Sequence, residues 1–160
     1  MTEIVPSDLH KVEPGYRWSL MIQSALFWVP LTVGALVVDR LLLHETPLAA
    51  ILPLLIFLMG FSATVYAPIR IYRRLGYAMD GRLLRVVRGW LFHIDTIVPF
   101  VKVQHIDVTS GPFDKLFGTA SLVVHTAGTH NSVVTLPGLA PARATEIRDA
   151  IRAEIRADSE

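Results

Sequence analysis

Histidines and carboxylates in the carboxyl-terminal half are the residues whose types could support metal or acid–base chemistry. The candidates for metal ligation are His93, His105, His125 and His130. No two of them have the i,i+2 spacing that shares one face of a strand, and no H-E-x-x-H motif is present. We therefore expect structural or solvent-facing histidines and no metal site, although a meeting of His125 and His130 across a turn depends on the fold.

Nucleophilic and paired-carboxylate chemistry has the necessary residue types without the necessary arrangement. The sequence contains no G-x-S-x-G motif and no phosphate-binding motif of the Walker or dinucleotide type. Asp80, Asp95, Asp107 and Asp114 are dispersed, and each fits a turn or a strand edge. The absence of cysteine excludes disulfides and thiolate chemistry. We expect no enzyme, no catalytic residue and no cofactor.

An arginine cluster is the one feature with a plausible binding role. Its members are Arg70, Arg73, Arg74, Arg82, Arg85 and Arg88, with Asp80 as the single acid among them. Each cation near an anionic leaflet contributes about 1 kcal/mol to membrane attraction. Specific head-group binding would use Arg73, Arg74, Arg82 and Arg85. We favour a role in setting membrane topology, because on a strand Arg85 faces away from Arg82 and Arg88.

Two long uncharged runs precede this cluster. Ser19–Val38 has 20 residues and Thr46–Ile69 has 24, and neither contains Asp, Glu, Lys, Arg or His. A helix of about 20 apolar residues crosses the hydrocarbon core of a bilayer. Because only Asp39–Glu45 separates the runs, they predict two neighbouring antiparallel spans, which form a transmembrane helical hairpin.

Two other interpretations of the runs are weaker. Buried core helices of a soluble protein are usually shorter, with about 10–14 apolar residues. A cleaved signal peptide is disfavoured by the acidic residues before the first run and by the lack of a clear cleavage site after it. Orientation follows from the cations, since the loop between the runs offers only Arg40 whereas Lys11, Arg17 and the arginine cluster flank the outer ends. We expect a protein of the inner or plasma membrane with both termini in the cytoplasm.

Short alternating patterns replace continuous apolarity after about Gly76. Asp80-Gly81 and Arg88-Gly89 are turn signals, and Leu83–Val87 and Trp90–Val98 are predicted strands. The second of these strands would place on one face Trp90, Phe92, Ile94 and Val98.

A change of phase marks the next segment. On a regular strand Val101 and Val103 would lie on one face, and Ile106 and Val108 on the other. Burial of both pairs on the same face therefore predicts a β-bulge or sheet corner near Gln104-His105. Further strands are expected over Ala120–Thr126 and Ser132–Leu136, and a helix over Pro141–Ala157 whose apolar stripe is Ala144, Ile147, Ile151 and Ile155. The pattern predicts an α+β domain, consistent with a pleckstrin-homology-like antiparallel β roll with a C-terminal helix.

Several motifs resemble those of one family. They are Val98–Gln104, Gly111-Pro112-Phe113, Leu116-Phe117-Gly118, Thr126-Ala127-Gly128 and Leu136-Pro137-Gly138-Leu139. In this order they are similar to bacterial pleckstrin-homology-domain membrane proteins of the YdbS-like type, over roughly residues 15–157. The resemblance implies two transmembrane helices ahead of a cytoplasmic pleckstrin-homology-like domain, with no established enzyme chemistry and no catalytic residues.

The sequence therefore predicts three parts: a cytoplasmic segment 1–18, a transmembrane hairpin 19–69 and a pleckstrin-homology-like domain 76–157. The favoured function is a membrane-anchored interaction module that binds a protein partner or a second copy of itself. Small residues in the spans would allow close helix packing, namely Gly34, Ala35, Gly60 and Ala63. The alternative is sensing of anionic lipid. A transporter subunit is disfavoured because neither span contains an ionisable residue, which ion or substrate pathways usually need. Fifteen Lys and Arg against fourteen Asp and Glu argue against a nucleic-acid partner.

Overall fold

The computed structural model describes residues 9–43, 45–46, 49–127 and 132–159. The chain divides into two compact units, which are described separately. The helical unit comprises residues 17–70, and the β unit comprises residues 1–16 and 71–160.

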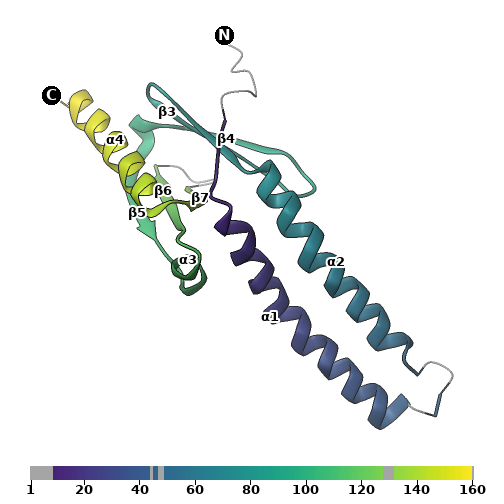
Figure 1. Ribbon diagram of the computed structural model, residues 1–160. Helices are drawn as coiled ribbons and strands as arrows, with labels where there is room; N and C mark the ends of the chain where they lie inside the picture. Colours follow the sequence, from purple (N-terminus) through teal and green to yellow (C-terminus); the bar gives the residue numbers. More distant parts are fainter. Residues whose placement is uncertain (1–8, 44, 47–48, 128–131, 160) are drawn as a thin grey trace. The chain divides into compact units, whose positions relative to one another are not determined.

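Two long helices form the helical unit. Helix α1 (Gly15–Val38) continues as the π-helical stretch η2 (Asp39–Leu43), and α2 (Ile51–Arg74) follows. Figure 1 shows them side by side. Only 6% and 17% of the residues in their most apolar stretches are buried, and each helix is long enough to cross a membrane. This exposure is unlike that of a core helix in a soluble protein, which buries its apolar residues.

Contacts within the helical unit close the hairpin. The sequence places Asp39 in the loop, whereas the structure includes it in η2. Its Oδ1 accepts a hydrogen bond from the backbone N–H of Ala50 (2.8 Å). The hydroxyls of Ser24 and Thr64 are 3.2 Å apart, and a Cβ added to Gly60 would lie 3.0 Å from Trp28. The expected close approach at Gly60 is therefore present. The helices begin at Gly15 and Ile51, whereas the uncharged runs begin at Ser19 and Thr46.

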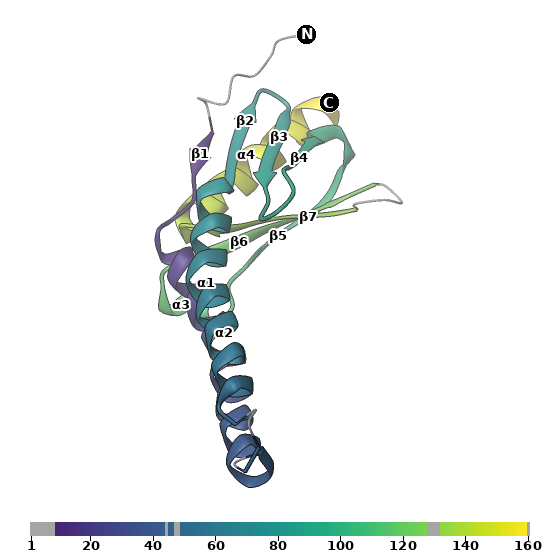
Figure 2. The ribbon, with the colours of Figure 1, turned by 90° about the vertical axis from the view of Figure 1, so that its right-hand side faces the viewer.

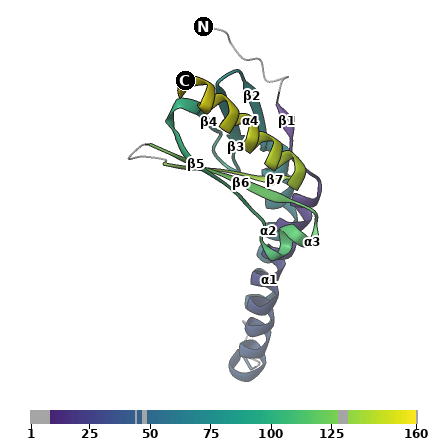
Figure 3. The same ribbon diagram turned by 90° about the vertical axis from the view of Figure 1, so that its left-hand side faces the viewer.

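Two antiparallel sheets form most of the β unit. The first has the order β1 (His10–Lys11), β2 (Gly76–Asp80), β3 (Leu83–Arg88) and β4 (Ile94–Pro99). The second has the order β5 (Val103–Thr109), β6 (Ala120–Thr126) and β7 (Val133–Leu139). Figure 2 shows the strands of the two sheets. Helix α4 (Pro141–Ser159) lies against the strands in Figure 3 and packs on β5 and β6.

The core of the β unit lies between the sheets and α4. It contains Leu84 and Val86 from the first sheet and Leu122 and Leu136 from the second. The predicted stripe on α4 is confirmed: Ala144, Ile147 and Ile151 are buried, and Ile155 packs against the cluster. Burial of one face of an otherwise polar helix is what attaches α4 to the sheets.

The predicted change of phase is confirmed. The register between β5 and β6 shifts between Val103 and His105. Just before it, the 3₁₀ turn η3 (Phe100–Lys102) carries the chain from β4 of the first sheet to β5 of the second. The slip therefore marks a sheet corner combined with a bulge.

The predicted strand over Trp90–Val98 is wrong at its beginning. Strand β4 starts at Ile94, and residues 89–93 form a bent loop. A Cβ on Gly89 would overlap the backbone oxygen of Phe92, so the chain folds back tightly there. Trp90 and Phe92 are exposed, at 52% and 79%, and do not share a face with buried Val98. The tight turn at Gly89 overrides the alternating pattern.

Strand β1 and helix α3 are among the elements that the sequence did not predict. Strand β1 pairs with β2 through His10↔Tyr77 and Lys11↔Gly76, so this part of the amino-terminal segment belongs to the β unit. Helix α3 (Pro112–Leu116) begins where Gly111-Pro112 was expected only to break a strand. Asp114 holds it, since its carboxylate accepts from the Gly111 N–H (3.1 Å) and the Thr119 hydroxyl (3.1 Å).

Candidate functional site

A groove of about 380 Å³ follows the outer edge of β4. Every residue of β4 lines it, and the remaining lining residues are Lys102, Thr126, Ala127 and Val134. Among the described strands β4 pairs only with β3, so its other edge is open toward this groove. The opposite wall is held by backbone hydrogen bonds from Ala127 to Lys102 (2.8 Å) and from Thr126 to Ser132 (2.7 Å).

The one ionisable side chain of β4 is Asp95, and it is paired. The Arg85 Nε donates to both Asp95 carboxylate oxygens, at 2.9 and 3.0 Å. This hydrogen bond lowers the pKa of Asp95 below its ordinary value. The carboxylate is therefore ionised and compensated at neutral pH, and the edge carries no uncompensated charge of its own.

The arginines of the predicted cluster are divided between the two units and between different partners. Arg70 belongs to the helical unit, while the other members belong to the β unit. Arg82 donates to Glu154 on α4 (2.9 Å), Arg85 to Asp95, and Arg74 to the backbone oxygen of Trp90 (3.0 Å). Two of the four arginines expected to hold a head group are thus engaged with carboxylates.

Two histidines of the second sheet meet, and sequence spacing did not predict this pair. His105 on β5 lies directly opposite His125 on β6, with ring centroids 6.0 Å apart. Asp107 lies 2.8 Å from His105 Nε2 and 3.6 Å from His125 Nε2. Sequence spacing missed this cluster because partners on different strands have no fixed separation along the chain. His130 lies outside the described residues, and among the described ones no group of three side chains is arranged to hold a metal ion.

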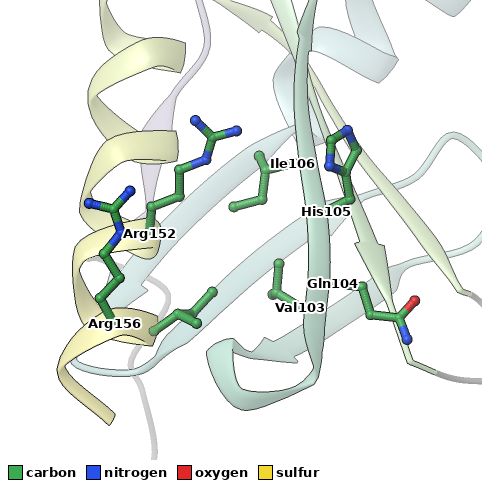
Figure 4. A pocket seen from close by; sticks show the side chains of 7 residues that line it. Val103, Gln104, His105, Ile106, Arg152 and Arg156 are labelled. Carbon is green, nitrogen blue, oxygen red and sulfur yellow. The ribbon is translucent and has the colours of Figure 1, made fainter. Parts of the chain in front are cut away.

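A second pocket, of about 270 Å³, lies between β5 and α4. Figure 4 shows Arg152 and Arg156 extending from α4. Ile106 lies on the side of β5 that faces α4, and His105 points to the other side. Val103, Ile106 and Ile155 give the pocket an apolar wall, and none of the described residues that line it is acidic. It can hold an anion with an apolar part, and it is smaller than the groove along β4.

These elements define a class: a β roll of two antiparallel sheets closed by a C-terminal helix and joined to apolar helices of membrane-spanning length. The model of the bacterial PH (pleckstrin-homology) domain family matches residues 24–155, and the chain belongs to that family. It is 29% identical over 97 residues to the transmembrane protein YdbS of Bacillus subtilis (strain 168). The match covers 60% of this chain and 59% of that relative. No solved structure matches the chain.

The comparisons confirm the YdbS-like resemblance and the fold class of helical hairpin plus pleckstrin-homology-like domain. Together with the two apolar helices they show a membrane protein. The matched families are not known for catalysis.

Proposed function

We propose that this protein is a membrane-anchored interaction module without catalysis of its own, and that the groove along β4 receives an extended segment of a protein partner. The observation that carries the proposal is the open edge of β4 along the whole length of that groove. An exposed strand edge binds a partner strand through main-chain hydrogen bonds, and alternate side chains give specificity.

The chemistry of the edge supports this occupant. Native proteins usually protect an edge strand with an unpaired charge, a proline or a bulge. Here Pro99 stands only at the last position of β4, and Asp95 is compensated by Arg85. Ile94 and Ile97 are about half exposed on the same strand. An extended apolar segment would cover these two side chains and also pair with the backbone N–H and C=O groups of the open edge.

Anchoring completes the proposed module. Both helices would cross the bilayer, and the distribution of cations supports a cytoplasmic position for the β unit and both chain ends. Arg40 is the one Lys or Arg of the hairpin loop, whereas Arg70, Arg73 and Arg74 lie near the carboxyl end of α2. A domain held at the bilayer needs no lipid affinity for recruitment, so its soluble surface is available for a partner.

Head-group sensing by the arginine cluster remains the alternative. It has less support, because Arg82 and Arg85 hold Glu154 and Asp95. Arg73, Arg74 and Arg88 would have to carry it.

Site-directed photo-crosslinking in native membranes tests the proposed groove. A photoreactive residue replaces Thr96 in the full chain, and a discrete adduct is expected, either with a partner or with a second copy of this 17.8 kDa chain. Adding Ile97→Lys should reduce the adduct several-fold, since a lysine on an edge opposes strand addition. The matched control is Leu116→Lys, which makes the same kind of change at an exposed residue of α3 outside the groove. An adduct that is absent, or that persists undiminished with Ile97→Lys, contradicts the proposal.

A further inference from the structure

The loop between β3 and β4 exposes three consecutive large apolar side chains. Trp90, Leu91 and Phe92 are 52%, 66% and 79% exposed. Single exposed apolar residues are ordinary on a protein surface, but a run of three at the tip of one loop needs a partner. From this loop and its attachment we propose that Trp90, Leu91 and Phe92 enter the head-group region of the same bilayer leaflet from which α2 emerges.

The attachment of the loop sets its depth. Arg74, the last residue of α2, donates from its guanidinium to the backbone oxygen of Trp90 (3.0 Å). Arg74 is five residues beyond Ile69, where the uncharged run ends. At about 1.5 Å per residue this is roughly 7.5 Å along the helix axis. One head-group layer is about 5–7.5 Å thick, so Arg74 reaches its outer part. A loop hydrogen-bonded to Arg74 is therefore at the level of the head groups.

A shared pocket also brings the loop next to the carboxyl end of α2. Ile71 and Leu75, at the end of α2, and Trp90 and Ile94 line one apolar pocket of about 300 Å³. Arg88 lines the same pocket at the end of β3. Residues that line one pocket lie near one another, so the loop lies beside the carboxyl end of α2.

Charge and residue type favour lipid over protein as the occupant. No acidic residue occurs from Gly81 to Ile94, while Arg88 and Arg74 flank the apolar tip. Tryptophan concentrates at membrane interfaces because its ring is amphipathic, and leucine and phenylalanine gain free energy when they leave water. Cations beside them meet phosphates of anionic lipids. This contact is distinct from the proposed groove, and it depends only on membrane anchoring.

Depth-dependent fluorescence quenching tests the loop directly, because the chain has no native cysteine. Phe92→Cys in the full chain carries an environment-sensitive fluorophore after reconstitution into vesicles of phosphatidylcholine and phosphatidylglycerol. The control is Val101→Cys, at a residue that is 71% exposed in the turn beyond the far end of β4. The six residues of β4 separate the two positions by roughly 20 Å.

The expected result is a blue-shifted label at position 92 that spin-labelled lipid quenches several-fold more than aqueous iodide, with the reverse order at position 101. Adding Leu91→Asp should return the label at position 92 to the aqueous behaviour. Equal iodide quenching at both positions overturns the inference. Protection from iodide in native membranes, combined with no quenching by spin-labelled lipid, would show a protein occupant and also overturns it. Neither result bears on crosslinking at Thr96, so the two proposals fail separately.

Discussion

The helical unit and the β unit use the same apolar residue types with opposite exposure. Leu122 in β6 is fully buried, whereas Leu58 in α2 is 53% exposed. The β unit removes its leucines from water through contacts between sheets and α4, which no single element could achieve alone. The helices of the other unit leave theirs on the outside, which is stable only where the solvent is itself apolar. Exposure thus identifies which solvent each unit is built for.

The largest expected effect comes from making the same leucine-to-alanine substitution in each unit. Leu122→Ala should lower the free energy of unfolding of the β unit by about 2–5 kcal/mol, because it leaves a cavity in a closed core. Leu58→Ala should cost less than about 1 kcal/mol, because lipid tails fill the space that the side chain leaves. Denaturant unfolding of the full chain in lipid nanodiscs, followed by hydrogen exchange, measures both. Similar costs at the two positions would mean that Leu58 does not face lipid.

The next effect concerns packing inside the helical unit. Gly60→Leu should weaken the contact between α1 and α2 by about 1–3 kcal/mol, because a Cβ there already meets Trp28. Gly34→Leu is the matched control, since no atom of the part of the chain that the structure describes lies within 4 Å of the Cβ position at Gly34. Fluorescence transfer between labels at the two helix ends reports the separation. If Gly34→Leu proved the more disruptive change, Gly34 would be in contact with a further helix.

The smallest effect is electrostatic and belongs to the β unit. Asp95→Asn should lower the melting temperature by a few degrees at neutral pH, because it removes the ion pair between β3 and β4. Arg85 lowers the pKa of Asp95 in the folded state, so this stabilisation is complete above the ordinary carboxyl pKa of about 4. It is lost as the pH falls through the lower folded value.

Thermal unfolding of the wild type and the Asp95→Asn variant between neutral pH and pH 3 measures this difference. The two melting temperatures should converge at the acidic end. Asp149→Asn is the control. Its partner Arg148 is the preceding residue on the same helix, so this ion pair does not connect two elements. A difference at Asp95 that grew toward acidic pH would contradict the assignment.

Much of the architecture was predictable because it depends on local periodicity. The stripe from Ala144 to Ile155 has the period of a helix, and the parity change around Gln104 requires a slip in a strand. Asp80-Gly81 predicted a turn, and Gly81 has the positive φ (+52°) that such a turn requires. Each of these signals is complete within a few residues.

The candidate surfaces were less predictable. The alternation through Trp90, Phe92 and Ile94 indicated a strand face, but the tight fold at Gly89 turns the first two outward. The pair His105 and His125 exists only because of the register between β5 and β6. The predicted division into segments 1–18, 19–69 and 76–157 stays a prediction, although β1 joins residues 10–11 to the first sheet.

The sequence by itself determined the two apolar helices, the amphipathic α4 and the antiparallel strands, because charge spacing and hydrophobic period act over a helical turn or a strand. Only the tertiary structure decided that the edge of β4 is open, that Arg82 and Arg85 meet carboxylates, and that an apolar loop is bound to the end of α2. These features depend on pairings between segments distant along the chain, and the free energy of such contacts is set by how the elements pack together.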